Sequence, residues 1–312
     1  MNLHKDKQLF NDLIAITSQF KGLKASDIER DYDIVLTLKR LTQSKFNNQV
    51  IFKGGTSLSK CYPGSINRFS EDIDLSLLSP QNTSKKKLES TLKEIETLLI
   101  GDLYFEIVPS ERSEISKSTY IWRNEFQKRV KLEIGINQIQ SDFMLKPFTT
   151  YISDYLIQSD NVSLIKQYDL EPISILTMEI QQTFMDKVFA IKRHSLSGNI
   201  ANKIRHLYDV SRLFDHQEIS KFLENKIKFK EIVYRTKIND EMYLLKRKSP
   251  MTYNPKEPYD FENWASSLNN STNEFAYKKM VENLVFGDNK ETFIQAISKL
   301  GLIVEKLKEI NE

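Results

Sequence analysis

The feature that most constrains the fold of this chain is a change of hydrophobic pattern part-way along it. From about residue 49 to 140, short β-prone runs are mixed with helical stretches. From about residue 171 onward, the apolar residues recur at helical spacing. The pattern predicts an α+β protein in which a domain of mixed strands and helices is followed by an all-helical domain. The β-prone runs cover 49–52, 73–78, 103–108, 119–126 and 130–136.

Helical periodicity predicts helices over 8–20, from Ser26 to about Phe46, and over the lysine-rich stretch 83–100. Ser26 and Glu29 have the spacing of a capping box at the start of the second helix. One apolar stripe of the helical part consists of Ile173, Leu176, Ile180, Phe184, Val188 and Ile191, and the next consists of Ile204, Leu207, Val210, Leu213 and Phe214. A polar loop follows at 248–258. We therefore predict two domains, 1–150 and 151–312, with the boundary near 145–170.

Composition excludes several classes of protein. With 40% hydrophobic residues, nine Gly and eight Pro in 312 residues, the chain is not disordered or collagen-like. The single cysteine, Cys61, excludes an internal disulfide framework, and the four His form no zinc-binding cluster in the sequence. No apolar run approaches the length of a membrane span, and the first residues lack a secretory signal. We expect a soluble, cytoplasmic protein without membrane contact.

A glycine pair followed by two alternating aspartates is the strongest chemical signal. Gly54 and Gly55 end a β-prone run, and glycine lets backbone N–H groups approach a phosphate closely. Asp72 and Asp74 alternate with apolar residues, so a strand would place both carboxylates on one face, where a divalent cation would relieve their repulsion. This arrangement suits metal-assisted phosphoryl or nucleotidyl transfer. The alternative interpretation is a tight turn followed by a polar-faced edge strand.

Lys131 and Glu133 repeat the alternation on another β-prone run. If that strand lies beside the strand of Asp72 and Asp74, Glu133 becomes a third carboxylate for metal, with Lys131 next to it. From this segment alone, a cross-strand ion pair on a solvated face is the better interpretation.

The segments Lys53–Lys60 (KGGTSLSK) and Arg68–Leu75 (RFSEDIDL) together resemble the first motif of the AbiEii/AbiGii toxin family, a branch of the DNA polymerase β-like nucleotidyltransferases. Glu133 with Lys131 lies where the second motif belongs, Lys187 resembles the third motif, and Asp209 in an R-x-x-x-D pattern resembles the fourth. The resemblance covers roughly residues 30–215. It implies a nucleotidyltransferase-fold mixed sheet with flanking helices, followed by a C-terminal helical bundle domain. It also implies a toxin of the type IV toxin–antitoxin kind, with an antitoxin as partner.

The resemblance also implies an NTP substrate, Mg²⁺ and transfer of a nucleotide to an acceptor, expected to be RNA, because some family members are reported to modify tRNA 3′ ends. Carried onto this sequence, the roles divide the motif residues into three sets. Asp72, Asp74 and Glu133 would hold the metal. The nucleotide would contact Gly54, Gly55, Thr56, Ser57, Lys60, Lys131 and Glu133. The catalytic set would be Asp72, Asp74, Lys187 and Asp209, with the helical domain contributing Lys187 and Asp209 to the cleft.

Each assignment in the helical part has a plainer alternative. Lys187 lies beside an apolar stripe and could be a lysine whose stem is buried and whose head reaches water. Asp209 lies four residues after Arg205 and three before Arg212, so it could form an ordinary ion pair within its helix. For the whole protein, the alternatives are a nucleotide-binding interaction protein without turnover, or a nucleotidyltransferase that modifies a protein or a small molecule.

A basic stretch at 217–256 holds ten Lys and Arg against five acidic residues. Tyr234, Tyr243 and Tyr253 lie among these charges. Phosphate contacts and base stacking could combine there, which makes an RNA-binding surface one interpretation. A solvated helical face is the commoner meaning of such a run.

Overall fold

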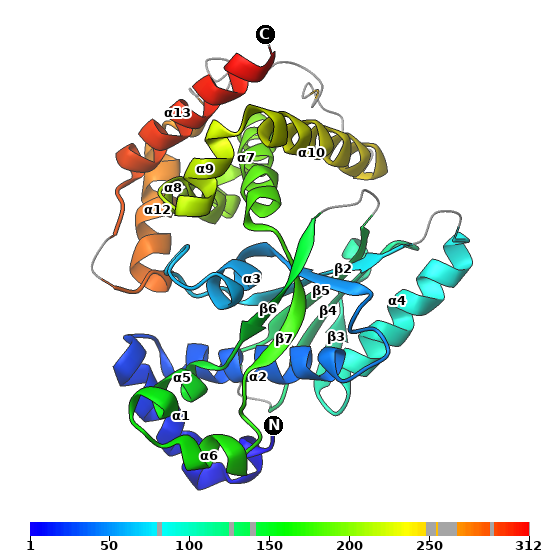
Figure 1. Ribbon diagram of the computed structural model, residues 1–312, viewed down its shortest axis with the longest axis vertical. Helices are drawn as coiled ribbons and strands as arrows, with labels where there is room; N and C mark the ends of the chain where they lie inside the picture. The colour runs from blue at the N-terminus through cyan, green and yellow to red at the C-terminus, as the bar shows by residue number, and fades with distance from the viewer. Residues whose placement is uncertain are drawn as a thin grey trace. The chain divides into compact units, whose positions relative to one another are not determined.

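The computed structural model of the protein describes residues 1–79, 83–124, 128–137, 142–247, 254, 267–287 and 290–311. The backbone forms two compact units (Figure 1). Unit 1 comprises Met1–Tyr62 and Phe69–Met178, and unit 2 comprises Pro63–Arg68 and Glu179–Glu312. The boundary that we predicted at residue 150 lies inside unit 1. The predicted loop 248–258 lies outside the described residues, apart from Asn254.

The strands of unit 1 are β1 (Val50–Lys53), β2 (Asp72–Leu78), β3 (Tyr104–Ile107), β4 (Ser116–Trp122), β5 (Val130–Asn137), β6 (Phe143–Phe148) and β7 (Ile173–Met178). Within the described residues they form one seven-stranded sheet in the order β3-β4-β5-β2-β1-β7-β6. β2 pairs with β5 in parallel, as β1 does with β7, whereas the other neighbours are antiparallel. The predicted mixed sheet is confirmed.

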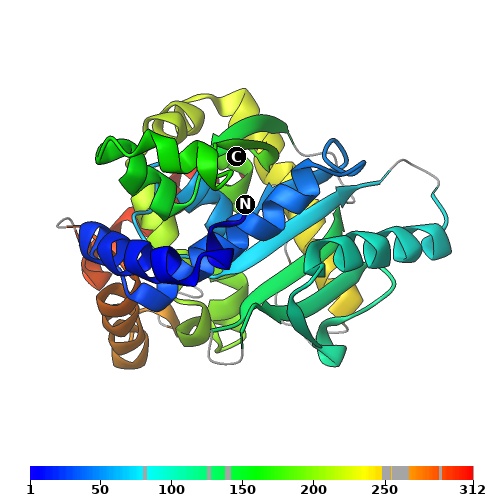
Figure 2. The same ribbon diagram turned by 90° about the horizontal axis from the view of Figure 1, so that it is seen from below.

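The helices of unit 1 are α1 (Lys7–Lys21), α2 (Ala25–Thr42), α3 (Gly54–Cys61), α4 (Lys85–Ile100), α5 (Tyr151–Gln158) and α6 (Val162–Gln167), with 3-10 turns η1 (Leu3–Lys5) and η2 (Pro109–Glu111). α2 packs on β5 and β7, and α4 packs on β4 and β5. Figure 2 shows these two helices from the side of the sheet on which they pack. α2 also contacts α1, α4 and α5, which explains why Ile28, Tyr32 and Leu38 on this helix are fully buried.

Three local predictions are corrected by unit 1. Residues 173–178 form strand β7 rather than helix, because the β-branched Ile173, Ile175 and Thr177 suit a strand beside β1. Strand β6 was not predicted. It contains Pro147 and lies at the sheet edge, where proline's missing N–H removes no hydrogen bond from the interior of the sheet. The capping box is wrong, because α2 already begins at Ala25 with Lys24 as its uncapped N-cap, and Glu29 binds Arg123 instead, at 3.0 Å.

Unit 2 is helical and contains α7 (Ile180–Leu196), η3 (Ile200–Lys203), α8 (Arg205–Phe214), α9 (Gln217–Glu224), α10 (Lys226–Arg247), α12 (Ser271–Leu284) and α13 (Phe293–Asn311). The stripe residues Ile180, Phe184, Val188 and Ile191 are fully buried where α7 packs against α8, α9 and α10. Segment 63–68 joins this unit through a β-bridge between Arg68 and Val285. The predicted all-helical C-terminal region is confirmed. Among the residues that the structure describes, no helix has the length and apolar character needed to cross a membrane.

Candidate active site

The register of the sheet brings the carboxylates of the predicted metal site together along two neighbouring strands. Asp72 on β2 pairs with Lys131 on β5, and Asp74 pairs with Glu133. Residues paired directly across two strands point to the same face of the sheet, so these four side chains share one face. The condition on which Glu133 would become a third carboxylate, that its strand lies beside that of Asp72 and Asp74, is therefore met.

The opposite face of the same strands is covered by α4. Thr119 on β4 donates a hydrogen bond to Glu96 on α4, and Thr119 pairs in register with Leu132, which pairs with Ile73. Leu132 and Ile73 are almost fully buried. Because strand side chains alternate, Asp72 and Asp74 point away from α4, to the face where they remain partly exposed. The structure therefore excludes the alternative of an edge strand, since β2 lies between β5 and β1.

Gly54 lies directly against the carboxylate of Asp74. Its φ is +80°, which is a left-handed conformation that favours glycine. A Cβ atom at this position would collide with Asp74 Oδ2 and would lie 2.9 Å from Asp74 Cγ. The glycine is thus required twice, once by the backbone conformation and once by the close approach of Asp74.

Helix α3 begins at this glycine, immediately after β1. Its N-cap, Lys53, makes no side-chain capping hydrogen bond. Backbone N–H groups of the first turn of a helix have no partner within the helix and attract anions. The Thr56 hydroxyl donates to the backbone carbonyl of Asp72, and the Ser57 hydroxyl donates to that of Gly54 at 2.9 Å. Both hydroxyls are buried and already donate hydrogen bonds within the protein, so backbone N–H groups, rather than these hydroxyls, are the candidates for an anion in this turn.

Lys131 and Glu133 form an ion pair with each other, and Lys131 Nζ also lies 2.5 Å from Glu111 Oε2. Burial favours the neutral amine of Lys131, but the carboxylates of Glu111 and Glu133 outweigh it and hold its pKa above the ordinary value. The segment thus forms ion pairs, but not the predicted cross-strand pair, because Glu133 lies on the same strand as Lys131 and Glu111 lies on η2. Among the described residues, no three His, Cys, Asp or Glu side chains are grouped closely enough to hold a metal ion.

Lys60 is engaged inside unit 1. Its Nζ lies 2.6 Å from Asp31 Oδ1 and 4.0 Å from the centroid of the Tyr151 ring. Asp31 also accepts a hydrogen bond from the Tyr151 backbone N–H at 2.7 Å. Lys60 and Asp31 are both buried, and this arrangement joins α3, α2 and α5. A nucleotide would have to break a buried ion pair to use Lys60.

In unit 2, Lys187 on α7 and Asp209 on α8 are in direct contact. Lys187 Nζ lies 2.7 Å from Asp209 Oδ2, and the two side chains are 7% and 0% exposed. Lys187 is therefore not a lysine whose head reaches water. Arg68 binds the same carboxylate, with Nε donating to Oδ1 at 2.6 Å and Nη2 donating to Oδ2 at 2.7 Å. Arg68 belongs to the first motif but had no predicted role; its partner is 141 residues away, so no local pattern could identify it.

The protonation states in this cluster follow from burial and charge. Desolvation alone would raise the pKa of Asp209, but Arg68 and Lys187 hold it well below the usual range. Burial lowers the pKa of Lys187 below its ordinary value, and Asp209 opposes that shift. Burial and the Lys187 ammonium lower the pKa of His206 well below its ordinary value. The cluster thus contains a carboxylate, a guanidinium and an ammonium beside a neutral imidazole.

Comparison with known proteins decides the family. The sequence profile of the nucleotidyl transferase AbiEii toxin family of type IV toxin–antitoxin systems matches residues 36–298. The chain belongs to the AbiEii family of nucleotidyltransferase toxins. No curated protein sequence matches the chain.

One solved structure agrees with the AbiEii assignment at the level of the fold. MenT4, a nucleotidyltransferase toxin from Mycobacterium tuberculosis, aligns with a TM-score of 0.61 at 14% identity, covering 95% of this chain and 89% of MenT4. An H. pylori protein assigned as a nucleotidyltransferase covers 83% of this chain and 98% of its own at 16% identity, but its TM-score of 0.39 is too low to indicate a shared fold. This AbiEii-family protein is thus a nucleotidyltransferase with the expected α+β architecture.

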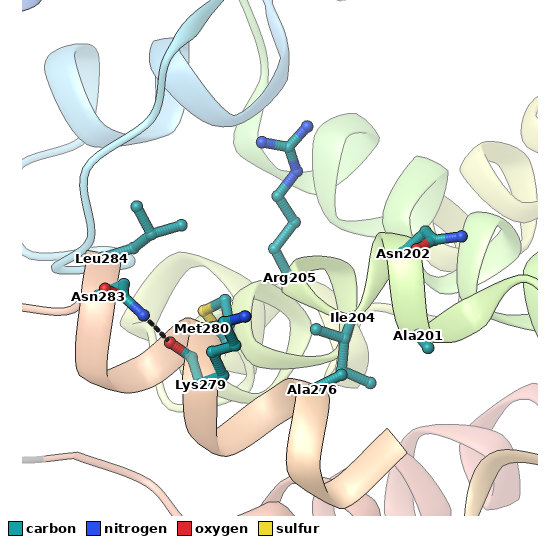
Figure 3. Close-up of a pocket in the computed structure, with 9 residues that line it drawn as sticks. All are labelled: Ala201, Asn202, Ile204, Arg205, Ala276, Lys279, Met280, Asn283 and Leu284. Carbon is teal, nitrogen blue, oxygen red and sulfur yellow. Dashed lines mark hydrogen bonds between the residues drawn. The ribbon is translucent and has the colours of Figure 1, made fainter. Parts of the chain in front are cut away.

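Unit 2 of this AbiEii-family protein also has a groove of about 490 Å³ between α12 and the start of α8 (Figure 3). In Figure 3, Arg205 extends from the start of α8 beyond the other side chains that line the groove. The lining consists of Ala201, Asn202, Ile204, Arg205, Ala276, Lys279, Met280, Asn283 and Leu284. It contains none of the predicted site residues.

The predicted basic stretch lies on α9, α10 and the residues after them. Lys228 binds Glu179 at 2.9 Å, and Tyr234 is 67% exposed. The ring of Tyr243 lies 4.6 Å from the guanidinium of Arg193. Lys248, Tyr253 and Lys256 lie outside the described residues. An RNA-binding surface here stays a prediction.

Proposed function

We propose that this AbiEii-family toxin transfers a nucleoside monophosphate from an NTP to a hydroxyl group of RNA, with the 3′ end of tRNA as the acceptor. One observation supports the proposal most directly. The carboxylate of Asp74, next to Asp72 on the same face of β2, lies against Gly54 at the uncapped start of α3. Carboxylates for a cation and backbone N–H groups for phosphates thus lie side by side within unit 1.

The residues present fit a divalent cation bound with a triphosphate. Asp72 and Asp74 offer oxygen ligands of the kind that Mg²⁺ prefers, and Mg²⁺ usually binds through one or two carboxylates together with substrate phosphates. When bound, Mg²⁺ would polarise the α-phosphate and offset the charge of the triphosphate. The N–H groups of Gly55 and Thr56 would bind phosphate oxygens and orient the α-phosphate for in-line attack.

Cationic side chains would complete the binding of the triphosphate. We propose that Lys187 neutralises phosphate charge and that Asp209, in contact with its ammonium, orients it. Lys131 would have the same effect if a nucleotide replaced its carboxylate partners, and that exchange would free Glu133 as a third metal ligand. Gly54, by allowing Asp74 close to the turn, keeps metal and phosphate sites adjacent.

The test is incubation of the protein with total tRNA, Mg²⁺ and each of the four NTPs in turn, labelled at the α-phosphate. The label should appear in RNA with at least one NTP, and the same NTP labelled at the γ-phosphate should leave the RNA unlabelled, because only the α-phosphate is transferred. Asp74→Ala protein, prepared in the same way, should give no labelled RNA. Absence of labelled RNA with all four NTPs would contradict the RNA acceptor.

The same experiment separates the alternatives. Label that appears in protein or in a small product would indicate a nucleotidyltransferase with another acceptor. Calorimetric binding of an NTP without any transfer would indicate a nucleotide-binding protein without turnover.

Toxicity follows from family membership and is tested separately. Induced expression should stop bacterial growth, and expression of Asp74→Ala at the same level should not. An antitoxin partner, Mg²⁺ and action in the cytoplasm, where NTPs and tRNA are found, belong to the same proposal. Equal growth of the wild-type and Asp74→Ala strains would contradict a toxic nucleotidyltransferase activity.

A further inference from the structure

Arg68 is the largest of the fully buried side chains in the described part of the chain, with 1% of its surface exposed. Its guanidinium donates to both oxygens of Asp209, at 2.6 and 2.7 Å. Such a two-pronged contact fixes both the position and the rotation of a carboxylate. The same carboxylate binds Lys187 Nζ at 2.7 Å through Oδ2. The orientation of the Lys187 ammonium thus depends on how Arg68 holds Asp209.

The backbone around Arg68 is itself held in place. Arg68 forms a β-bridge with Val285, and the N–H of Phe286 donates to the carbonyl of Asn67 at 3.1 Å. Asn67 has a φ of +43°, a left-handed backbone conformation that asparagine adopts more readily than most other residues with a side chain. Ile66, just before it, is fully buried. These contacts leave the Arg68 side chain little freedom to follow a displaced Asp209.

We propose that Arg68 is a positioning residue, which holds the Asp209 carboxylate so that Asp209 places the Lys187 ammonium for phosphate binding. The inference rests on the proposed function, in which Lys187 contacts the triphosphate. Arg68→Lys would keep the positive charge but would lose the planar guanidinium, whose two N–H donors bind both oxygens of Asp209. Lysine would therefore not replace arginine here.

The charged groups around Lys187 come from several elements. Asp209 on α8 favours its charged form, whereas Arg68 on segment 63–68 and Arg205 on α8 disfavour it. His206, on α8, is neutral because burial and the Lys187 ammonium lower its pKa. Removing the charge of Arg68 therefore raises the pKa of Lys187, which reports that the two groups are close, whereas Arg68→Lys keeps the charge and reports on the geometry of the contact with Asp209.

The first test is a double-mutant cycle on nucleotide transfer with Arg68→Gln, Asp209→Asn and the variant that carries both changes. Misplacement of a reacting group by about 1 Å costs on the order of 100-fold in rate, so we expect a loss of that size in each single variant. If Arg68 acts through Asp209, the double variant should be no worse than the poorer single variant. Losses that multiply, or wild-type transfer by Arg68→Gln, would overturn the proposal.

Two further variants separate positioning from folding. Arg68→Lys should fold but transfer nucleotide more slowly than wild type. The fall in its transfer rate at high pH, which we attribute to deprotonation of Lys187 (the alkaline limb of the pH–rate profile), should stay at the wild-type pH because the charge at position 68 is kept. Arg68→Gln should move that limb to higher pH, because the Lys187 ammonium loses a neighbouring positive charge. The control is Arg212→Gln on the same helix as Asp209, which should transfer like wild type. An unmoved limb in Arg68→Gln would show that Arg68 stabilises the fold only.

A readout without catalysis keeps this inference distinct from the proposed function. In protein with ¹³C-labelled lysine ε-carbons, the Lys187 signal is assigned by its loss in Lys187→Arg. Its titration should move to higher pH in Arg68→Gln and stay close to wild type in Arg212→Gln. If it does so while no variant, wild type included, transfers nucleotide, then the proposed function fails, and the closeness of Arg68 to the Lys187 ammonium, on which the positioning depends, stands. An unchanged titration in Arg68→Gln overturns the positioning role whatever the activity.

Discussion

Replacement of Gly54 by alanine tests the closest contact in the candidate active site. The φ of +80° makes the left-handed backbone unfavourable for alanine by about 1–2 kcal/mol. The new Cβ would also collide with Asp74 Oδ2 and lie 2.9 Å from Cγ and 3.1 Å from Cβ of Asp74. Since the backbone of β2 is held by β1 and β5, the carboxylate must rotate away to relieve the collision.

The two effects have different consequences, which Gly22→Ala separates. Gly22 also has a left-handed backbone, with a φ of +64°, but a Cβ atom added there would meet no other group within 4 Å. Both alanine variants should therefore lose about 1–2 kcal/mol of unfolding free energy, measured by urea denaturation. Gly54→Ala should in addition lose on the order of 100-fold in transfer rate, because the Asp74 oxygens leave their position.

The decisive comparison is transfer by the two variants under conditions in which both are folded. Gly22→Ala should transfer nucleotide like wild type, and calorimetry should show its affinity for Mg²⁺-NTP unchanged. Gly54→Ala should lose both affinity and rate. Equal transfer by Gly54→Ala and Gly22→Ala would refute the inference that the closeness of Gly54 and Asp74 serves the reaction.

Other predictions concern single side chains. Asp72→Ala and Asp74→Ala should lose most of their affinity for Mg²⁺-NTP in calorimetric titrations, and unchanged affinity in both would argue against the metal site. Lys187→Ala should lose about 100- to 1,000-fold in transfer rate, the usual effect of removing one charge-stabilising contact, and retained wild-type transfer would remove Lys187 from the reaction. Because the pKa of Asp209 is lower in the folded state than in the unfolded state, its contribution to stability is present above the ordinary Asp pKa of 3.8 and is lost as the pH falls below it. Urea unfolding between pH 5 and 3 should thus show a shallower pH dependence in Asp209→Asn than in wild type; equal slopes would contradict this.

Sequence reasoning worked best where a pattern of consecutive residues has one structural meaning. The alternation of Asp72, Ile73 and Asp74 predicted a strand with both carboxylates on one face, and β2 has that arrangement. It failed at Ile173–Met178, because residues such as Ile173 and Leu176 fit helical spacing as well as a strand. The chain resolves the ambiguity by pairing this segment with β1 and β6, which the local pattern does not reveal.

The sequence by itself determined the strand pattern of Asp72–Leu78, the glycine pair before α3, the helical character of the C-terminal part and, through its motifs, the family. Each of these depends on residues close together in the chain, where periodicity and backbone preference act. Only the tertiary structure placed Glu133 beside Asp74, and only it brought Arg68 to Asp209 across 141 residues. Such partners are selected by the packing of a whole unit, because a buried charge is stable only beside a partner that the fold delivers to it.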